Sequence, residues 1–307
     1  MLDINLVREN PSLVKKNLEK RFQKDKLSWI EEILNLDQRW RGLKQEVEEL
    51  RHERNVISKN INVLKKQDKP YHNELKRAQS LPKEIATLED QANKAKEKID
   101  YYLFNLPNIL HEKVPVGQDA SKNKVIRKYS KLNKSKFELK NHVELLELLK
   151  LADFEQGREV SGQGFNYLMD EIARLDLALQ RYGIDFLLKR GFRLIVLPMM
   201  LRKESLSGAV DLNAFQDVIY KVENEDLYLI GTAEHSLVTF LKNKTVKKDE
   251  LPIKICAMTP CFRKEVGGHG VDTKGLFRMH QFNKVEQVVF TTKETSYKML
   301  EEMQKIT

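Results

Sequence analysis

Residues 260–287 read PCFRKEVGGHGVDTKGLFRMHQFNKVEQ, and this stretch decides how the C-terminal half of the chain folds. Two strand-like segments, IKICAMTPCFRKEV (253–266) and GLFRMHQFNKVEQVVF (275–290), flank the loop GGHGVDTKG (267–275). This arrangement predicts two paired strands. Residues two apart on a strand share a face. One face is therefore expected to carry Arg263 and Glu265 from the first strand, and Arg278, His280, Phe282, Lys284 and Glu286 from the second.

Charged side chains are rarely this dense within strands unless one face lines a pocket. Guanidinium groups bind phosphate through a planar fork of donors. An aromatic ring stacks on a nucleobase, and carboxylates bind an ammonium group. These residue types fit a substrate with phosphate, a flat ring and an amine. A solvent-exposed sheet face with ion pairs, each worth about 0–1 kcal/mol, explains the same residues equally well at this point.

The preceding residues predict helices followed by short strands. HVELLELLKLADF (142–154) and DEIARLDLALQRYGIDFLLKR (170–190) have helical periodicity. FRLIVLP (192–198) is a short β-rich run, and VIYKV (218–222) and LYLIGTA (227–233) predict a hairpin around a polar turn. Another helix is expected from about Lys293. This order of elements predicts an α+β domain built on an antiparallel sheet.

The N-terminal third has heptad patterning that predicts a long coiled-coil hairpin over about 27–106. The first apolar seam runs from Ile33 to Leu64 and is interrupted only by Arg54; the second runs from Leu81 to Leu106. KKQDKPYHN (65–73) between the seams supplies a turn. Because proline disrupts the interior of a helix, the second helix is expected to begin at Pro82 or to kink there, with irregular chain before it.

The far end of this hairpin is rich in basic residues. They are Arg51, Arg54, Lys59, Lys65, Lys66, Lys69, Lys76 and Arg77, against the acidic Glu53, Asp68 and Glu74. A basic tip on a rigid stalk can reach a distant phosphate backbone. The pattern alone favours an ordinary solvated coiled-coil surface. A structural or adaptor protein therefore remains an open interpretation of the hairpin.

Composition narrows the class of protein. The chain has 307 residues and a formal net charge of +9, which weakly favours a polyanionic partner. No apolar run approaches the roughly 20 residues that span a bilayer, and MLDINLVREN lacks the apolar core of a signal peptide. No membrane association and a cytoplasmic location are therefore expected. Cys256 and Cys261 have no second cysteine pair with which to form a metal site, so reduced, packed thiols are expected.

The segment 260–287 resembles the second signature motif of class II aminoacyl-tRNA synthetases, in its seryl form. GTAEHSLV (231–238) resembles the TAE motif of seryl-tRNA synthetases, and GFRLIVLP (191–198) resembles the first class II motif. LPNILHEKVPVGQDASKN (106–123), VSGQGFNYL (160–168) and ARLDLAL (173–179) also resemble that family, and the resemblance covers the whole chain. SGAVDLNAFQDVIYKV (207–222) is similar to the archaeal-type branch.

The resemblance implies an organisation for the whole chain. Residues 1–110 are expected to form a tRNA-binding domain with a coiled-coil arm, 111–140 a linker, and 141–307 an incomplete class II catalytic core. The arm is expected to bind tRNA(Ser), and the strand before Pro198 to help form a homodimer. The implied reaction is ATP-dependent activation of L-serine, with Mg²⁺ bridging the phosphates, followed by transfer to tRNA.

The same resemblance implies roles for individual residues. Arg263 is the catalytic residue, expected to contact the α-phosphate; Glu265 is expected at the adenine edge and Arg278 at the far phosphates. The remaining expected ATP-binding residues are Lys264, Met279 and Phe282, with Phe282 stacked on adenine. The expected serine-binding residues are Thr232, Ala233, Glu234 and Glu286, with Glu286 holding the ammonium group. No protein-only metal site is expected.

One departure from the family pattern limits these expectations. The Gly-rich third motif, whose arginine clamps ATP, and the late residues that read the serine hydroxyl do not occur in this sequence. The chain is therefore interpreted as a fragment of a serine–tRNA ligase. The alternative is a short paralogue that binds tRNA or a nucleotide without catalysing aminoacylation.

Overall fold

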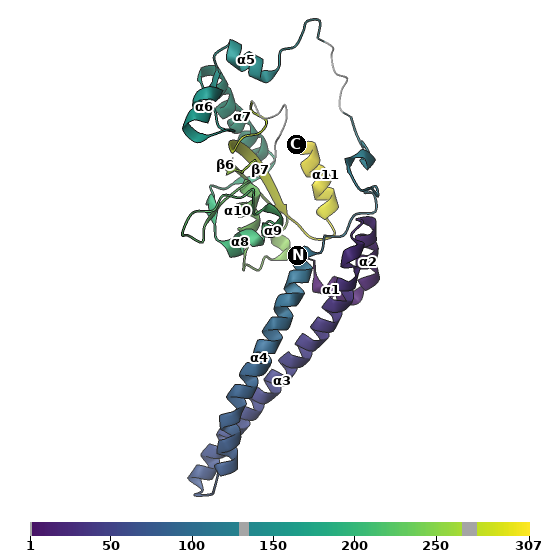
Figure 1. Cartoon of the computed structure of the whole chain (residues 1–307), viewed down its shortest axis with the longest axis vertical. Helices are drawn as coiled ribbons and strands as arrows, with labels where there is room; N and C mark the ends of the chain where they lie inside the picture. Colours follow the sequence, from purple (N-terminus) through teal and green to yellow (C-terminus); the bar gives the residue numbers. More distant parts are fainter. Residues whose placement is uncertain (1, 129–134, 266–274) are drawn as a thin grey trace. The chain divides into compact units, whose positions relative to one another are not determined.

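The computed structural model describes residues 2–128, 135–265 and 275–307. The chain divides into two compact units, 1–132 and 133–307, and each is described by itself. The α+β fold class expected from the sequence is confirmed, with a helical hairpin in the first unit and a sheet in the second (Figure 1). No helix in the described part of the chain is long and apolar enough to cross a membrane.

The first unit is helical. Its elements are α1 (Ile4–Glu9), α2 (Pro11–Lys20), the 3₁₀ turn η1 (Lys24–Lys26), α3 (Leu27–Lys66), α4 (His72–Asn105) and the 3₁₀ turn η2 (Ala120–Lys122). Helices α3 and α4 run side by side as an antiparallel hairpin (Figure 1). The buried seam contains Val47 from α3 and Leu81, Ile85 and Ala92 from α4. The expected hairpin is thus present, and its apolar heptad positions form the contact between the helices.

Pro82 does not begin a helix, and the expectation of irregular chain before it is wrong. Helix α4 starts at His72, ten residues earlier, and continues through Pro82. Arg77 joins the turns on either side of the proline: its Nη1 lies 2.7 Å from Glu84 Oε1, and its Nε lies 2.8 Å from Glu53 Oε1 on α3. These ion pairs lie beside the turn at which proline removes a backbone hydrogen bond.

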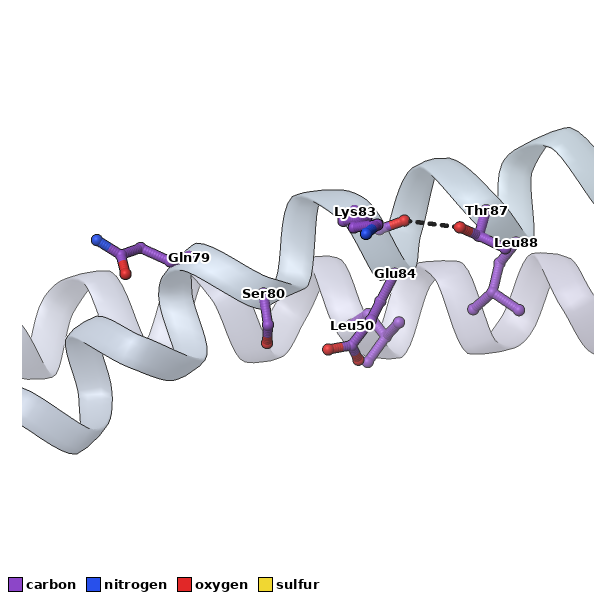
Figure 2. A pocket seen from close by; sticks show the side chains of 7 residues that line it. All are labelled: Leu50, Gln79, Ser80, Lys83, Glu84, Thr87 and Leu88. Atoms are coloured by element: carbon purple, nitrogen blue, oxygen red, sulfur yellow. Dashed lines mark hydrogen bonds between the residues drawn. The ribbon is translucent and has the colours of Figure 1, made fainter.

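A shallow groove of about 520 Å³ lies on the hairpin beside the proline turn (Figure 2). Thr87 Oγ1 donates to the Lys83 carbonyl oxygen in this region, at 2.9 Å. The side chains that line the groove are those of Leu50, Gln79, Ser80, Lys83, Glu84, Thr87 and Leu88. The lining comes mainly from α4, so the groove follows from the local path of that helix.

The second unit has its helices around a small sheet. The helices are α5 (His142–Leu148), α6 (Phe154–Ser161), α7 (Asp170–Leu188), α8 (Lys203–Ser207), α9 (Leu212–Phe215), α10 (Ala233–Thr239) and α11 (Ser296–Ile306), with the 3₁₀ turn η3 (Lys248–Glu250). The strands are β1 (Ala152–Asp153), β2 (Tyr167–Leu168), β3 (Arg193–Leu194), β4 (Met200–Leu201), β5 (Tyr228–Leu229), β6 (Ile253–Phe262) and β7 (Gln281–Phe290). The strand expected over 192–198 is thus only two residues long.

The main sheet has the order β3-β6-β7. Strands β6 and β7 are antiparallel, with Ile253 opposite Phe290 and Phe262 opposite Gln281, whereas β3 runs parallel to β6. The sheet is therefore mixed, with β6 at its centre, antiparallel to β7 and parallel to β3. Two-stranded sheets are formed by β1 with β2 and by β4 with β5.

The two faces of the main sheet pack against different helices. On one face, Ile255 and Ala257 of β6 contact Ala233 and Leu237 of α10. On the other face, Cys256 packs with Leu187 at the end of α7, with Phe192, and with the partly buried Val285, Val289 and Ile306. Both cysteines are buried free thiols, as expected. The alternation of side chains along β6 and β7 thus decides which residues face α10.

Candidate active site

The strand pairing brings an aromatic and two charged side chains of β7 onto the α10 face. Phe282, Lys284 and Glu286 are two residues apart, so they share this face. They lie opposite Cys261, Thr259 and Ala257 of β6, respectively, and these three residues are buried. The floor of the site is therefore closed to solvent, and the polar groups of β7 project from it.

Thr232 connects α10 to this row of side chains. It is the N-terminal capping residue of α10 and is buried. Its Oγ1 donates to Glu286 Oε2 at 2.7 Å. Lys284 Nζ lies 3.0 Å from the same Oγ1 and 2.5 Å from the same Oε2. Thr232, Lys284 and Glu286 thus form a closed three-membered set of contacts, which we call the Thr–Lys–Glu cluster.

Arg263 lies at the end of β6, beside this cluster. Its backbone N–H donates to the His280 carbonyl oxygen at 2.9 Å and extends the pairing with β7. Its Nε donates to the Gly231 carbonyl oxygen at 2.9 Å, and its guanidinium carbon lies 5.2 Å from the Phe282 ring centroid. The guanidinium group is held at a cation–π distance from an aromatic face. Its Nη groups are not engaged by either contact.

His235 supports the turn that precedes α10. Its Nδ1 lies 3.4 Å from the Gly231 backbone nitrogen, whose N–H donates to it. Burial, together with the positive charges of Arg263 and Lys284, lowers the pKa of His235 from 6.5 to about 4. The imidazole is therefore neutral near pH 7, which its role as an acceptor requires. Gly231 thus links His235 through its N–H and Arg263 through its carbonyl.

A second group of polar side chains lies next to Arg263 along the chain. The Lys264 backbone N–H donates to the Val218 carbonyl oxygen at 2.7 Å, and Lys264 Nζ lies 5.4 Å from the Tyr220 ring centroid. Tyr220 Oη forms a hydrogen bond with His280 Nδ1, and the His280 ring stacks on Phe165 at 5.1 Å. This group fixes the chain on both sides of the segment 266–274, which lies outside the described residues.

The remaining predicted site residues lie elsewhere. Arg278 is exposed, and Met279 Sδ accepts a hydrogen bond from Asn166 Nδ2 at 2.8 Å. Ala233 is fully buried in the core, whereas Glu234 is exposed and its backbone N–H lies 3.4 Å from Thr232 Oγ1. Glu265 is half-buried next to the undescribed loop. Of the predicted residues, the structure therefore brings together Arg263, Phe282, Thr232 and Glu286.

The predicted strand was wrong over residues 275–280. These residues form bends, and β7 begins only at Gln281. Counting back from Phe282 in steps of two residues therefore does not give the face of the sheet on which Arg278 lies. Lys284 and His235 had no role assigned from the sequence. Lys284 could have been found from its place between Phe282 and Glu286, whereas the contact of His235 with Gly231 required the turn geometry.

Comparison with known proteins finds a matching family model within each of the two units. Residues 1–110 match the family model described as the seryl-tRNA synthetase N-terminal domain. Residues 219–307 match the model described as the tRNA synthetase class II core domain (G, H, P, S and T). The serine–tRNA ligase of Pyrococcus horikoshii is 44% identical over 323 aligned positions, which cover 99% of this chain and 71% of that relative. The chain belongs to the serine–tRNA ligase family.

Further relatives and solved structures agree with this family. The serine–tRNA ligase of Methanocella arvoryzae is 41% identical, again over 99% of this chain and 71% of that relative. The crystal structure of seryl-tRNA synthetase from P. horikoshii complexed with ATP matches 99% of this chain and 73% of its own, with a TM-score of 0.87 and 43% identity. The cytoplasmic serine–tRNA ligase of Naegleria fowleri in complex with AMP matches 100% of this chain and 71% of its own, with a TM-score of 0.82 and 32% identity.

The neutral His235 makes the stability of the second unit depend on pH. Because its pKa is lower in the folded chain, the unfolded chain binds this proton first as the pH falls from about 6.5 to about 4. We expect the free energy of unfolding to fall by about 2 kcal/mol more in the native chain than in His235→Leu between pH 7 and pH 4.5.

Urea titrations read by pulsed hydrogen exchange in β6 and β7 measure this difference. The two tryptophans, Trp29 and Trp40, both lie in the first unit, so fluorescence would report on the wrong unit. His52→Asn, at an exposed position on α3, is the control and should leave the pH dependence of β6 and β7 unchanged. An equal pH dependence in His235→Leu and the native chain would contradict a buried neutral imidazole.

Proposed function

We propose that this chain activates L-serine with ATP to form seryl-adenylate and transfers the seryl group to the 3′ end of tRNA(Ser). The observation that carries this proposal is the position of the Thr–Lys–Glu cluster beside the Arg263–Phe282 pair in a member of the serine–tRNA ligase family. One half of this site offers groups for an ammonium, and the other offers an aromatic face and a guanidinium.

The ATP half of the proposed site is built around Phe282 and Arg263. The Phe282 ring provides a face on which adenine stacks, and the Nη groups of Arg263 donate to the α-phosphate. Glu265 binds the adenine edge, Arg278 the far phosphates, and Lys264 and Met279 complete the nucleotide contacts. The proposal for Arg278 requires its exposed side chain to turn toward ATP on binding.

The serine half of the proposed site is built on the turn at Thr232. Glu286 accepts hydrogen bonds from the serine ammonium, and Thr232 Oγ1 accepts a further hydrogen bond from the other side of that ammonium. Ala233 and Glu234 contribute through the turn rather than through side chains aimed at the cluster, because Ala233 is buried and Glu234 is exposed. Serine then lies with its carboxylate toward Arg263.

The proposed first step is an in-line displacement at the α-phosphorus. A serine carboxylate oxygen forms the new P–O bond, while the bond to the β-phosphate oxygen breaks and pyrophosphate leaves. Charge grows on the α-phosphate oxygens, so a fixed guanidinium at Arg263 stabilises the transition state. The Gly231 carbonyl orients that guanidinium through Nε before substrate binds.

Mg²⁺ is part of the proposal as an ion carried by the phosphates of ATP. Magnesium in such sites is held largely by substrate phosphates and water, with few protein ligands. The described residues contain no group of three or more His, Cys, Asp or Glu side chains that could hold it without the nucleotide. When bound, it neutralises phosphate charge. We place the reaction in the cytoplasm, where translation consumes charged tRNA.

Arg263→Ala is expected to lower serine-dependent ATP–pyrophosphate exchange by at least about 100-fold, because it removes charge stabilisation from the transition state. Initial rates at saturating serine and ATP measure this change. Arg190→Ala removes an exposed guanidinium at the end of α7 and is the matched control. Unchanged exchange in Arg263→Ala would show that the site is misassigned. A folded native chain that binds tRNA but exchanges no pyrophosphate would favour the alternative of a non-catalytic relative.

We propose that the hairpin of α3 and α4 binds tRNA(Ser) through its far end. The structure separates the basic residues there into two groups. Arg51 is paired with Glu48 and Glu89, and Arg77 with Glu53 and Glu84. The others are exposed and form no ion pair among the described residues: Arg54, Lys59, Lys65, Lys66, Lys69 and Lys76. This second group is available to phosphate, and it recognises shape and backbone rather than bases.

The double variant Lys66→Glu/Lys69→Glu is expected to raise the Kd for tRNA(Ser) by about tenfold or more, and to reduce the salt slope of binding by about two. Filter binding at several salt concentrations measures both quantities. The control, Lys94→Glu/Lys98→Glu, changes two exposed lysines of α4 away from the tip. Exchange measured without tRNA should be equal in all three proteins. Equal effects of the two double variants would contradict tip-specific binding.

We further propose a homodimer formed through α7 and the segment before Pro198. Leu175, Leu179 and Tyr182 are exposed and follow helical spacing, so they form one apolar stripe on α7. Val196 is 95% exposed although it follows a strand of the main sheet. Apolar side chains gathered in this way are typical of a surface that is covered in an assembly.

Leu179→Lys/Tyr182→Lys is expected to convert a dimer to a monomer at micromolar concentration, because it buries two charges in an apolar contact. Sedimentation velocity measures the change. Leu177→Lys lies on α7 outside the stripe, is also exposed, and should leave the dimer intact. A native chain that sediments as a monomer at these concentrations would contradict the proposal.

A further inference from the structure

The proposed ammonium site already holds a cation of the protein itself. Lys284 Nζ lies 2.5 Å from Glu286 Oε2 and 3.0 Å from Thr232 Oγ1. Glu286 and Thr232 are the two side chains that the proposed function assigns to the serine ammonium. A second ammonium group cannot occupy the same position between Oε2 and Oγ1, because like charges repel and Nζ already fills it. A serine ammonium bound between Glu286 and Thr232 in this position therefore displaces Lys284 from at least one of these oxygens.

The position of Lys284 on β7 determines where its ammonium can go. It lies between Phe282 and Glu286 on the same face, about 7 Å from each along the strand. Phe282 is the proposed adenine platform and Glu286 the proposed ammonium acceptor. The proposed P–O bond between the serine carboxylate and the α-phosphorus forms between adenine at Phe282 and the ammonium at Glu286. Lys284 therefore lies beside the serine carboxylate. Its flexible side chain can turn from Glu286 to that carboxylate with a small movement of Nζ.

The charges around Lys284 make such an exchange selective. Glu286 is its ion-pair partner among the described residues, while Arg263 and the neutral His235 offer it no negative charge. The Glu286 side chain is 18% exposed and that of Lys284 is 34% exposed, so a displaced ammonium is partly shielded from water. It therefore needs a new anion. An α-amino acid brings one, because it is a zwitterion.

We propose that Lys284 is a specificity-determining residue that makes the site select zwitterionic α-amino acids over simple amines. This inference rests on the proposed function, since it assumes that the substrate ammonium binds Glu286 and Thr232. The substrate ammonium replaces that of Lys284 on these two oxygens, and the substrate carboxylate becomes the new partner of Lys284. An amine without a carboxylate expels Lys284 and leaves it without a partner.

Serine and serinol provide the test, because serinol keeps the ammonium and hydroxymethyl groups and lacks the carboxylate. Ligand-observed NMR titrations of the full chain give the Kd of each, without ATP. We expect the native chain to bind serine at least 100-fold more tightly than serinol. In Lys284→Met, which keeps an unbranched side chain one atom shorter and removes its charge, serinol should bind at least tenfold more tightly than it does to the native chain. The ratio of the two Kd values should fall accordingly.

Two further variants make the result specific to the cation at this position. Lys284→Arg keeps a positive charge and should keep the preference for serine. Lys254→Met removes a lysine from β6 that pairs with Glu302 at 3.1 Å, and it should change neither Kd. A native-like hydrogen-exchange pattern in β6 and β7 establishes that each variant is folded. If Lys284→Met does not fold, a loss of the serine preference in folded Lys284→Arg overturns the inference, and a preserved preference supports it.

The outcomes separate this inference from the function on which it rests. Serine binding by the native chain with an unchanged ratio in folded Lys284→Met overturns the role of Lys284 alone. Weaker binding of both ligands by that variant also overturns it, because Lys284 would then only hold Glu286 in place. A native chain that binds neither ligand overturns the proposed serine site and this inference together.

Discussion

The register between β6 and β7 holds the candidate site together. Phe282 pairs with Cys261 and Glu286 with Ala257, so the polar residues of β7 face α10. A slip of one residue would turn Phe282, Lys284 and Glu286 to the opposite face, against Leu187 and Phe192. Two charges would then be buried against apolar side chains without Thr232, at a cost of several kcal/mol. The apolar cores on both faces thus select the register that also aligns the site.

That alignment leaves polar groups in a closed environment, and each is satisfied locally. Thr232 and Glu286 are 54 positions apart in sequence, yet Oγ1 and Oε2 are within hydrogen-bond distance because α10 packs on this face. Lys284 supplies the opposing charge. Burial, with the nearby positive groups of Arg263 and Lys284, keeps His235 neutral by lowering its pKa, and its acceptor nitrogen then fixes Gly231. A polar cluster of this kind is stable only when every member has a partner.

The sequence predicted those parts of the site that depend on one local period. Phe282 and Glu286 were placed on one face because they lie in a single regular strand. The same period was wrong for Arg278, because Gly275, with a φ of +116°, starts a series of bends that breaks the alternation. The contact of Thr232 with Glu286 follows from the packing of a helix on a sheet, which no local pattern encodes. The strand period puts Lys284 beside Glu286 on one face, but its contact with Thr232 follows from the same packing of helix on sheet.

The hairpin of α3 and α4 also shows what a local sequence pattern can and cannot predict. Its heptads predicted two helices and their contact, since the apolar seam is itself the interface. They did not predict that α4 would continue through Pro82, because a heptad pattern does not encode contacts such as the pairing of Arg77 with Glu53 on the other helix and with Glu84, two residues beyond the proline. The same ion pairs remove Arg77 and Arg51 from the set of basic groups open to phosphate. The formal charge of the tip therefore overstates how many of its basic side chains can bind a polyanion. The exposed lysines near the turn are the main ones left for this contact.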